Sequence, residues 1–169
     1  MYAVDPGARK TKGRQSYLAT FDAGELIAVM PVTRESAAGL ESPDVLVTER
    51  PQQDGRSQVV PPATLITLAW YGALTIGALR PRELVEFTPN EWKGQVSKPV
   101  HHLRIWRVLT PAERRCFPAD TEARIRAGAE ATARAGRLAR YSFDATNLLD
   151  ATGIGLLYIG RVGKGGARI

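Results

Sequence analysis

The 169-residue chain has few of the residues on which several protein classes depend. It has one cysteine, Cys116, which excludes an internal disulfide and leaves no thiol partner for a cysteine-type zinc site. A lone cysteine favours a reducing, cytosolic setting, and we expect the thiol to be buried or idle. Aromatic residues make up 7% of the chain, whereas 44% is hydrophobic and 24% charged, which is typical of a globular protein. Disordered, collagen-like and coiled-coil classes are therefore excluded.

Long apolar runs are also missing. The longest, residues 63–79, is interrupted by threonines and glycines and is shorter than the roughly 20 residues that a membrane-spanning helix needs. The first residues, Met1 to Asp5, lack the basic region and the apolar run of a signal peptide. We therefore expect no secretion and no membrane partner, and interpret residues 63–79 as part of a buried or interface helix.

Positive charge is in excess but unevenly distributed. The chain has 23 Lys and Arg against 17 Asp and Glu, a net charge of +6, and 18 of the cations are arginine. The arginine guanidinium binds phosphate through two parallel hydrogen bonds, so a nucleic-acid partner is the first expectation. A GC-rich or thermophilic source would give the same bias toward arginine. Residues 1–100 hold 11 cations and 11 acids, so the whole surplus lies in residues 101–169.

The order of apolar runs and turn signals predicts an α/β fold. Strands are expected at 2–4, 16–21, 26–32, 45–48 and 84–87, and helices at 34–39, 62–79, 89–92, 101–108, 111–116, 121–135 and 144–158. Turn residues between the first three strands favour antiparallel pairing, and the intervening helices favour parallel pairing of the later strands. We expect the helix over 62–79 to be packed on two sides. One domain over 1–160 and a basic tail over 161–169 are expected.

Three carboxylates stand where a site could form. Asp5 ends the first strand, Glu49 ends the fourth, and Asp150 lies in the last helix with Asn147 and Asp144 at spacings of three. Oxygen ligands from separate elements suit Mg²⁺ or Mn²⁺. The structural alternatives are a turn former for Asp5, an ion pair with Arg50 for Glu49 and a helix N-cap for Asp144.

These residues carry a resemblance. Val4-Asp5-Pro6-Gly7, Val47-Thr48-Glu49-Arg50-Pro51 and the segment 147–156, with sequence NLLDATGIGL, resemble the ribonuclease-H-like fold of RuvC-type Holliday junction resolvases, especially phage-borne members. The resemblance spans nearly the full length. It implies a five-stranded mixed sheet flanked by helices, in a homodimeric, Mg²⁺-dependent endonuclease that resolves four-way DNA junctions by paired symmetric nicks in the cytoplasm of a bacterium or phage-infected host cell.

The resemblance also implies an acidic tetrad at Asp5, Glu49, Asp150 and a fourth position, which here is Asn147. As a hypothesis, Asp5 bridges two ions, Glu49 holds the ion that activates water, and Asp150 with Asn147 or Asp144 holds the other. Asn147 departs from the family pattern, because an amide oxygen brings no charge and cannot act as a base. Asp144, one helical turn before Asn147, is an alternative fourth ligand.

Several cations and amides are candidate DNA contacts. They are Arg9, Lys10, Lys12 and Arg14 after the first strand, Gln53 and Arg56 in the loop after Glu49, and Lys93 and Lys98 in a glycine-containing loop. Relatives place DNA-contacting lysines and junction-entering residues in comparable regions. The structural alternative for each is a solvated surface charge.

Two further functions stay open. One is a nuclease of the same fold that acts on RNA or an RNA–DNA hybrid. The other is a non-catalytic junction-binding module, which is suggested by the neutral Asn147 at the fourth ligand position. Neighbouring residues on a helix face different ways, so His101 and His102 are not expected to share a metal. Trp70, Tyr71, Trp92 and Trp106 are expected in core or dimer packing.

Overall fold

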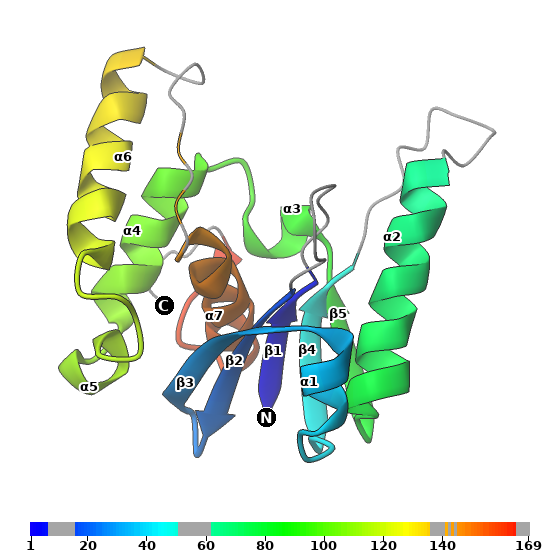
Figure 1. The fold of residues 1–169 in the computed structure, drawn as a ribbon. Coiled ribbons are helices and arrows are strands. Elements are labelled where there is room, and N and C mark those ends of the chain that lie inside the picture. Colours follow the sequence, from blue (N-terminus) through cyan, green and yellow to red (C-terminus); the bar gives the residue numbers. More distant parts are fainter. Residues whose placement is uncertain (7–15, 51–61, 136–140, 142, 144, 165–169) are drawn as a thin grey trace.

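The computed structural model describes residues 1–6, 16–50, 62–135, 141, 143 and 145–164. Within these ranges, five strands and eight helical segments follow one another (Figure 1). They are β1 (Tyr2–Asp5), β2 (Ser16–Asp22), β3 (Glu25–Val32), α1 (Arg34–Ala38), β4 (Val45–Glu49), α2 (Pro62–Gly72), the π-helical segment η1 (Ala73–Leu79), β5 (Glu83–Phe87), α3 (Pro89–Trp92), α4 (Lys98–Val108), α5 (Pro111–Arg114), α6 (Thr121–Ala135) and α7 (Thr146–Tyr158).

The strands form one sheet in the order β3-β2-β1-β4-β5. β1, β2 and β3 pair antiparallel, whereas β1 with β4 and β4 with β5 pair parallel. Helices separate the parallel strands along the chain, since a parallel pair needs a long crossover connection. The expected α/β fold, a five-stranded mixed sheet with its first three strands antiparallel and helices at its sides, is confirmed.

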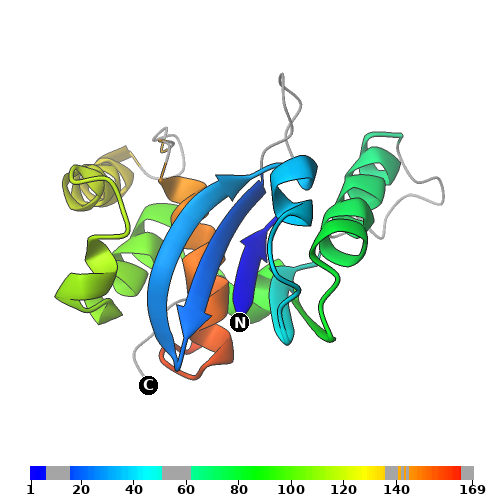
Figure 2. The ribbon, with the colours of Figure 1, turned by 60° about the horizontal axis from the view of Figure 1, so that its bottom comes forward.

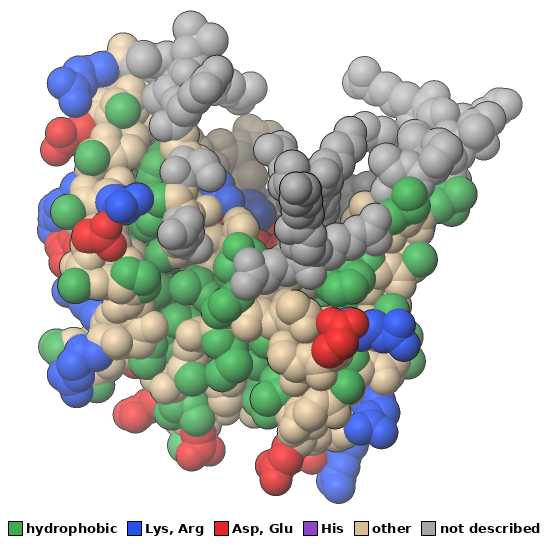
Figure 3. All heavy atoms as spheres, in the orientation of Figure 1, with side chains coloured by type: hydrophobic (Ala, Val, Ile, Leu, Met, Phe, Trp, Pro, Cys, Tyr) green, Lys and Arg blue, Asp and Glu red, His purple; other side chains and the backbone are tan. Residues whose placement is uncertain are grey.

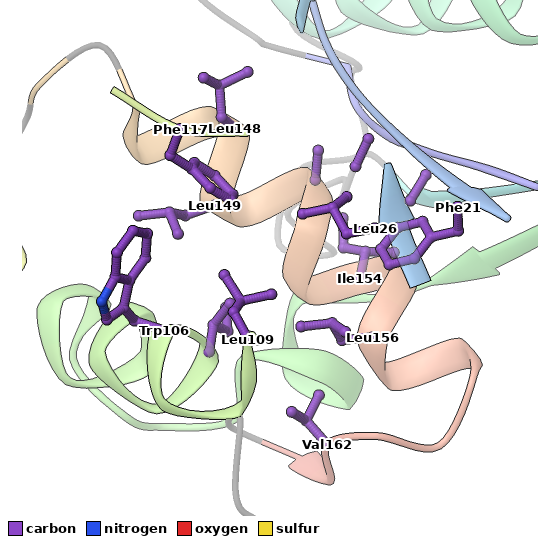
Figure 4. Close-up of a cluster of buried hydrophobic side chains, with 14 of the residues drawn as sticks. Phe21, Leu26, Trp106, Leu109, Phe117, Leu148, Leu149, Ile154, Leu156 and Val162 are labelled. Carbon is purple, nitrogen blue, oxygen red and sulfur yellow. The ribbon is translucent and has the colours of Figure 1, made fainter. Parts of the chain in front are cut away.

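Side chains alternate between the two faces of the sheet, and each face packs into its own hydrophobic core. Ala3 of β1 and Val47 of β4 face α7 and α4, whereas Val4 and Leu46, their neighbours in sequence, face α1 and η1. Figures 1 and 2 show these helices on opposite sides of the sheet. The larger core lies on the α7 side, where Phe21, Leu26, Trp106, Leu109, Phe117, Leu148, Leu149, Ile154, Leu156 and Val162 pack together (Figure 4).

Helix α7 lies very close to the sheet at Gly155. A Cβ atom built there would be 2.2 Å from Cε2 of Phe21 and 3.0 Å from Cβ of Ala3. No ordinary contact is that short, so glycine is required for this approach. Because α7 is buried along most of its length, its close packing also fixes the depth of Asp150.

The base of the segment between β1 and β2 is closed by hydrogen bonds. The Ser16 hydroxyl donates to the Pro6 carbonyl oxygen at 2.9 Å. The Trp70 indole N–H of α2 lies 3.2 Å from the same carbonyl and 3.2 Å from the Ser16 hydroxyl. The chain directly after Asp5 is therefore held to both β2 and α2.

The described residues of this chain cover only one side of the helix over 62–79, for which packing on two sides was expected. Within the chain, Leu74 and Leu79 of η1 are buried, but Leu65 of α2 is 53% exposed and Ile76 of η1 is 64% exposed. Ile66 and Leu68 are exposed as well, and hydrophobic side chains follow the outer side of α2 in the space-filling view (Figure 3). An apolar residue count along a helix does not reveal whether the second face is covered by the same chain.

Several helix boundaries differ from the sequence-based prediction. Helix α4 begins at Lys98 rather than at His101, because Pro99 occupies its first turn, where a missing N–H costs nothing. Helix α5 ends at Arg114, and α7 begins at Thr146. Asp144, the expected cap of the last helix, lies outside the described residues.

The first two residues of the expected tail over 161–169 contact the body of the protein. Arg161 forms an ion pair with the buried carboxylate of Glu113, and its Nη2 donates to the Val108 carbonyl oxygen at 2.9 Å. Val162 is buried in the larger core. Residues 161 and 162 therefore belong to the packed body. No helix in the described ranges has the length and apolar character needed to cross a membrane.

Candidate active site

Asp5 and Glu49 end two adjacent parallel strands. The register pairs Ala3 with Val47 and Val4 with Thr48, so Asp5 and Glu49 follow at the same edge of the sheet. The alternation of side chains places both on the α7 side, with Ala3 and Val47. Both residues are half-buried. The expectation that the first and fourth strands bring these carboxylates side by side agrees with this pairing.

Asp150 contributes a third carboxylate from α7, and its side chain is only 3% exposed. Lys98 Nζ lies 2.7 Å from its Oδ2 atom, and His102 Nε2 lies 2.9 Å from its Oδ1 atom. Burial alone raises the pKa of Asp150, but the His102 hydrogen bond and the nearby positive charges outweigh it. The pKa of Asp150 therefore lies well below its ordinary value, and the carboxylate is ionised.

Lys93 lies between Glu49 and Asp150. Its Nζ atom is 2.9 Å from Glu49 Oε2 and 3.9 Å from Asp150 Oδ2. Burial lowers the pKa of Lys93, but the charges of Asp150 and Glu49, with a smaller contribution from Asp5, raise it above its ordinary value. The ammonium group is therefore charged and is attracted by all three predicted acids.

Trp92 orients the Glu49 carboxylate. Its indole N–H donates to Glu49 Oε2 at 2.7 Å, and its buried ring has the Lys93 ammonium 4.3 Å from the ring centroid. Helix α3 holds this tryptophan through a capping box, in which Thr88 and Glu91 satisfy each other's backbone N–H groups. The carboxylate thus has a fixed donor on one side and a cation beside it.

The remaining predicted site residues are less fully placed. Asn147 is half-buried on α7, three residues before Asp150. Outside the described residues lie the alternative ligand Asp144 and the predicted DNA contacts Arg9, Lys10, Lys12, Arg14, Gln53 and Arg56. Lys93 and Lys98, predicted as DNA contacts, lie instead among the carboxylates, each with part of its side chain open to solvent.

The carboxylate oxygens of Glu49 and Asp150 are suitable ligands for a hard divalent cation, although in this structure they contact lysines. Among the described residues, no three acidic, histidine or cysteine side chains are close enough together to hold one metal ion. Glu49 and Asp150 nevertheless share one cation, the Lys93 ammonium. Carboxylate oxygens that converge on a single positive charge are the type of donor that Mg²⁺ and Mn²⁺ select. The residues therefore fit such an ion in charge and in ligand type.

Sequence reasoning missed two partners of the carboxylates. Trp92 was expected in core packing, which its burial confirms, but its bond to Glu49 crosses 43 residues and leaves no local signal. His102 was expected to have no shared role with His101. The His101 ring packs edge-on against Trp92 at 4.8 Å, whereas His102 contacts Asp150. Because the two histidines are adjacent in the sequence, their pattern offered no reason to assign the Asp150 contact to His102.

A scan with protein-family models, a search of the curated proteins and a search of the solved structures found no match to this chain.

Proposed function

We propose that this chain is a Mg²⁺-dependent endonuclease that resolves four-way DNA junctions by paired symmetric nicks. One observation carries the proposal: carboxylates from β1, β4 and α7 all act on the Lys93 ammonium at the carboxyl ends of the central parallel strands. Ligands and substrates of α/β sheets bind at this end of the strands. The resolvase-like motifs of the sequence contain these three acids, and the sheet is the expected five-stranded mixed sheet.

Asp5, Glu49 and Asp150 would hold the metal, with the Asn147 or Asp144 oxygen as the proposed fourth ligand. A pair of Mg²⁺ or Mn²⁺ ions in each active site supplies an activated water and stabilises the attacking and leaving oxygens of the phosphodiester. Trp92 keeps one Glu49 oxygen oriented by its hydrogen bond. The buried position of Asp150 excludes bulk water from that side of the site.

Lys93 and Lys98 would bind the DNA phosphate. In the protein alone their ammonium groups neutralise Glu49 and Asp150. When the carboxylates are neutralised by metal, the same two flexible cations become available to the scissile phosphate and its neighbours. The predicted DNA contacts of the flanking loops would extend this basic surface, since phosphate contacts supply most of the affinity of a DNA-binding protein.

A homodimer is the proposed assembly, as two symmetric nicks need two active sites. The exposed apolar side chains of α2 and η1 support an interface there, with Leu65, Ile66, Leu68 and Ile76 as its members. The two-fold axis of such a dimer would match the symmetry of a four-way junction. The proposed compartment is the cytoplasm of a bacterium or of a phage-infected host cell.

A second candidate function is a non-catalytic junction-binding module. It is favoured by one observation, namely that within the described ranges no three potential ligands form a metal-binding group. The neutral Asn147 points in the same direction. A nuclease that acts on RNA or an RNA–DNA hybrid is distinguished by substrate.

The experiment is a cleavage assay on three substrates. The protein is incubated with Mg²⁺ and a mobile four-way junction, an RNA–DNA hybrid or linear duplex DNA, each end-labelled on every strand in turn. Paired nicks at symmetric positions of the junction alone support the proposal, with EDTA as the control that abolishes them. Junction binding without cleavage at any Mg²⁺ or Mn²⁺ concentration would establish the binding module, and cleavage of the hybrid alone would overturn both.

A further inference from the structure

A buried hydrogen-bonded chain leads from Tyr141 to Asp150. His102 on α4 is fully buried, with its Nε2 atom 2.9 Å from Asp150 Oδ1 and its Nδ1 atom 3.0 Å from the Tyr141 hydroxyl oxygen. The three residues come from different parts of the chain, 39 and 48 residues apart. None of the sequence motifs includes His102 or Tyr141.

The direction of the chain follows from what each group can donate. An ionised carboxylate only accepts hydrogen bonds, so His102 Nε2 must carry the proton that bonds to Asp150. The neutral imidazole then has an acceptor at Nδ1, and the Tyr141 hydroxyl is the donor that faces it. Burial lowers the pKa of His102, more than Asp150 raises it, and burial raises the pKa of Tyr141. Both shifts favour the neutral ring and the protonated phenol.

The bond leaves the second oxygen of Asp150 for a cation. Because His102 takes Oδ1, Oδ2 faces the two lysines, with Lys98 Nζ at 2.7 Å and Lys93 Nζ at 3.9 Å. A carboxylate without such a donor could rotate and present either oxygen. The ring of His102 therefore selects which oxygen of Asp150 meets the positive charge.

Tyr141 is itself held in place by α6. A Cβ atom at Gly128 would lie 2.1 Å from Cδ2 of the Tyr141 ring, so only glycine leaves room for the ring at this point. The ring of Phe143 packs edge-on against it at 5.5 Å. The hydroxyl thus reaches His102 from a packed position rather than from a free side chain.

We infer that His102, held by Tyr141, is a positioning residue that directs Asp150 Oδ2 toward the cation site. This inference rests on the proposed function in that the cation is a divalent metal during catalysis. Outer-shell donors of this kind change metal affinity or activity by roughly 10- to 100-fold when they are removed.

The first test needs no activity. In ¹H–¹⁵N NMR of the whole protein labelled at histidine, His102 should show the pattern of a neutral ring protonated at Nε2, with its signal assigned by its loss in His102→Gln. Tyr141→Phe and Gly128→Ala should both shift its Nδ1 resonance toward that of a nitrogen without a donor. Protonation at Nδ1 in the wild type, or an unchanged Nδ1 resonance in Tyr141→Phe, would overturn the inference.

The second test measures metal affinity directly. Mn²⁺ titrations by calorimetry compare the wild type with His102→Leu, which removes the donor, and His102→Gln, whose side-chain amide can donate the same bond. We expect His102→Leu to weaken binding by about tenfold and His102→Gln to restore most of it. Equal affinities in the two variants would contradict the inference. If the wild type binds no Mn²⁺, the proposed function fails, whereas the NMR result still decides the orientation of His102.

Discussion

Lys93 Nζ lies 2.9 Å from Glu49 Oε2, and this contact joins the segment after α3 to the end of β4. It places an ammonium group at the point where the proposed nuclease would hold a metal. Two carboxylates that share a site, such as Glu49 and Asp150, repel each other unless a cation balances them. In the protein without metal, that cation is the Lys93 ammonium group. The competition between Lys93 and a metal ion for the carboxylates can therefore be measured.

Removal of the Lys93 charge should increase stabilisation by Mg²⁺. In Lys93→Met the carboxylates lose a cation that competes with the metal, so we expect the dissociation constant for Mg²⁺ to fall about tenfold, or about 1.4 kcal/mol. A ligand that binds only the folded state raises Tm more as its dissociation constant falls. Thermal melts with and without Mg²⁺ test this, and Lys164→Met, an exposed lysine, is the control. A smaller Mg²⁺-dependent rise than in the wild type would contradict it.

Neutralising any of the three acids should abolish junction cleavage. Asp5→Asn, Glu49→Gln and Asp150→Asn each keep the side-chain shape but remove a charge that stabilises the metal, so we expect losses of roughly 100-fold or more in nicking rate. Asp44→Asn is the matched control, because the exposed Asp44 side chain pairs with the exposed Arg82 and lies before the start of β4, at the opposite end of that strand from Glu49. Wild-type rates in two of the three variants would exclude the proposed centre.

Gly155→Ala should destabilise the protein. The added methyl group would meet the Phe21 ring at 2.2 Å, and overpacking of a close-packed core costs about 1–3 kcal/mol. Gly72→Ala in α2 is the control, since its Cβ meets nothing within 4 Å and alanine favours a helix. Urea unfolding measures both free energies. Partial recovery in the double variant Gly155→Ala with Phe21→Leu is expected if the ring is the obstacle.

The stability contributed by Glu113 should depend on pH. Its carboxylate accepts from Arg161 Nη2 at 2.8 Å and from the Leu26 N–H at 2.9 Å. Burial alone would raise the pKa of Glu113, but these bonds lower it from 4.5 to about 2. The stabilisation is therefore complete above the unfolded pKa of 4.5 and is lost as the pH falls toward 2.

Unfolding of Glu113→Gln tests that dependence. We expect it to be about 3 kcal/mol less stable than the wild type at pH 7, because a buried charge pair loses one partner. The difference should shrink below pH 4.5. A difference that stays constant from pH 7 to pH 2.5 would show that the charge of Glu113 contributes nothing.

Charge on the outer side of η1 should weaken self-association. Ile76 is 64% exposed, and a glutamate there would be buried without a partner in the proposed dimer, so Ile76→Glu should raise the dimer dissociation constant at least about tenfold. Ile27→Glu is the control, because Ile27 on β3 is 56% exposed and lies on another element. Light scattering over a concentration series measures both. An unchanged dimer in Ile76→Glu would place the interface elsewhere.

The strand positions and the places of Asp5 and Glu49 at strand ends were accessible from the sequence. Both residues follow short apolar strands whose ends are marked by proline, and parallel pairing then fixes their edge. The depth of Asp150 was also indicated by the apolar residues around it. Periodicity and turn residues are local signals. They suffice for these features, because each depends on residues that are close together in the sequence.

The partners of the acids were not accessible in the same way. Trp92 reaches Glu49, and His102 reaches Asp150, only after α3, α4 and α7 have packed together. The exposure of Ile76 and the anchoring of Arg161 likewise depend on which surfaces the fold covers. A hydrophobic pattern states that a side chain favours burial but does not state what buries it.

The hydrogen bond between Ser16 and Pro6 has a consequence for Asp5. Since Pro6 is fastened to Ser16 of β2 and to Trp70 of α2, the backbone that carries Asp5 is preorganised. Less conformational entropy is therefore lost when this carboxylate binds a partner.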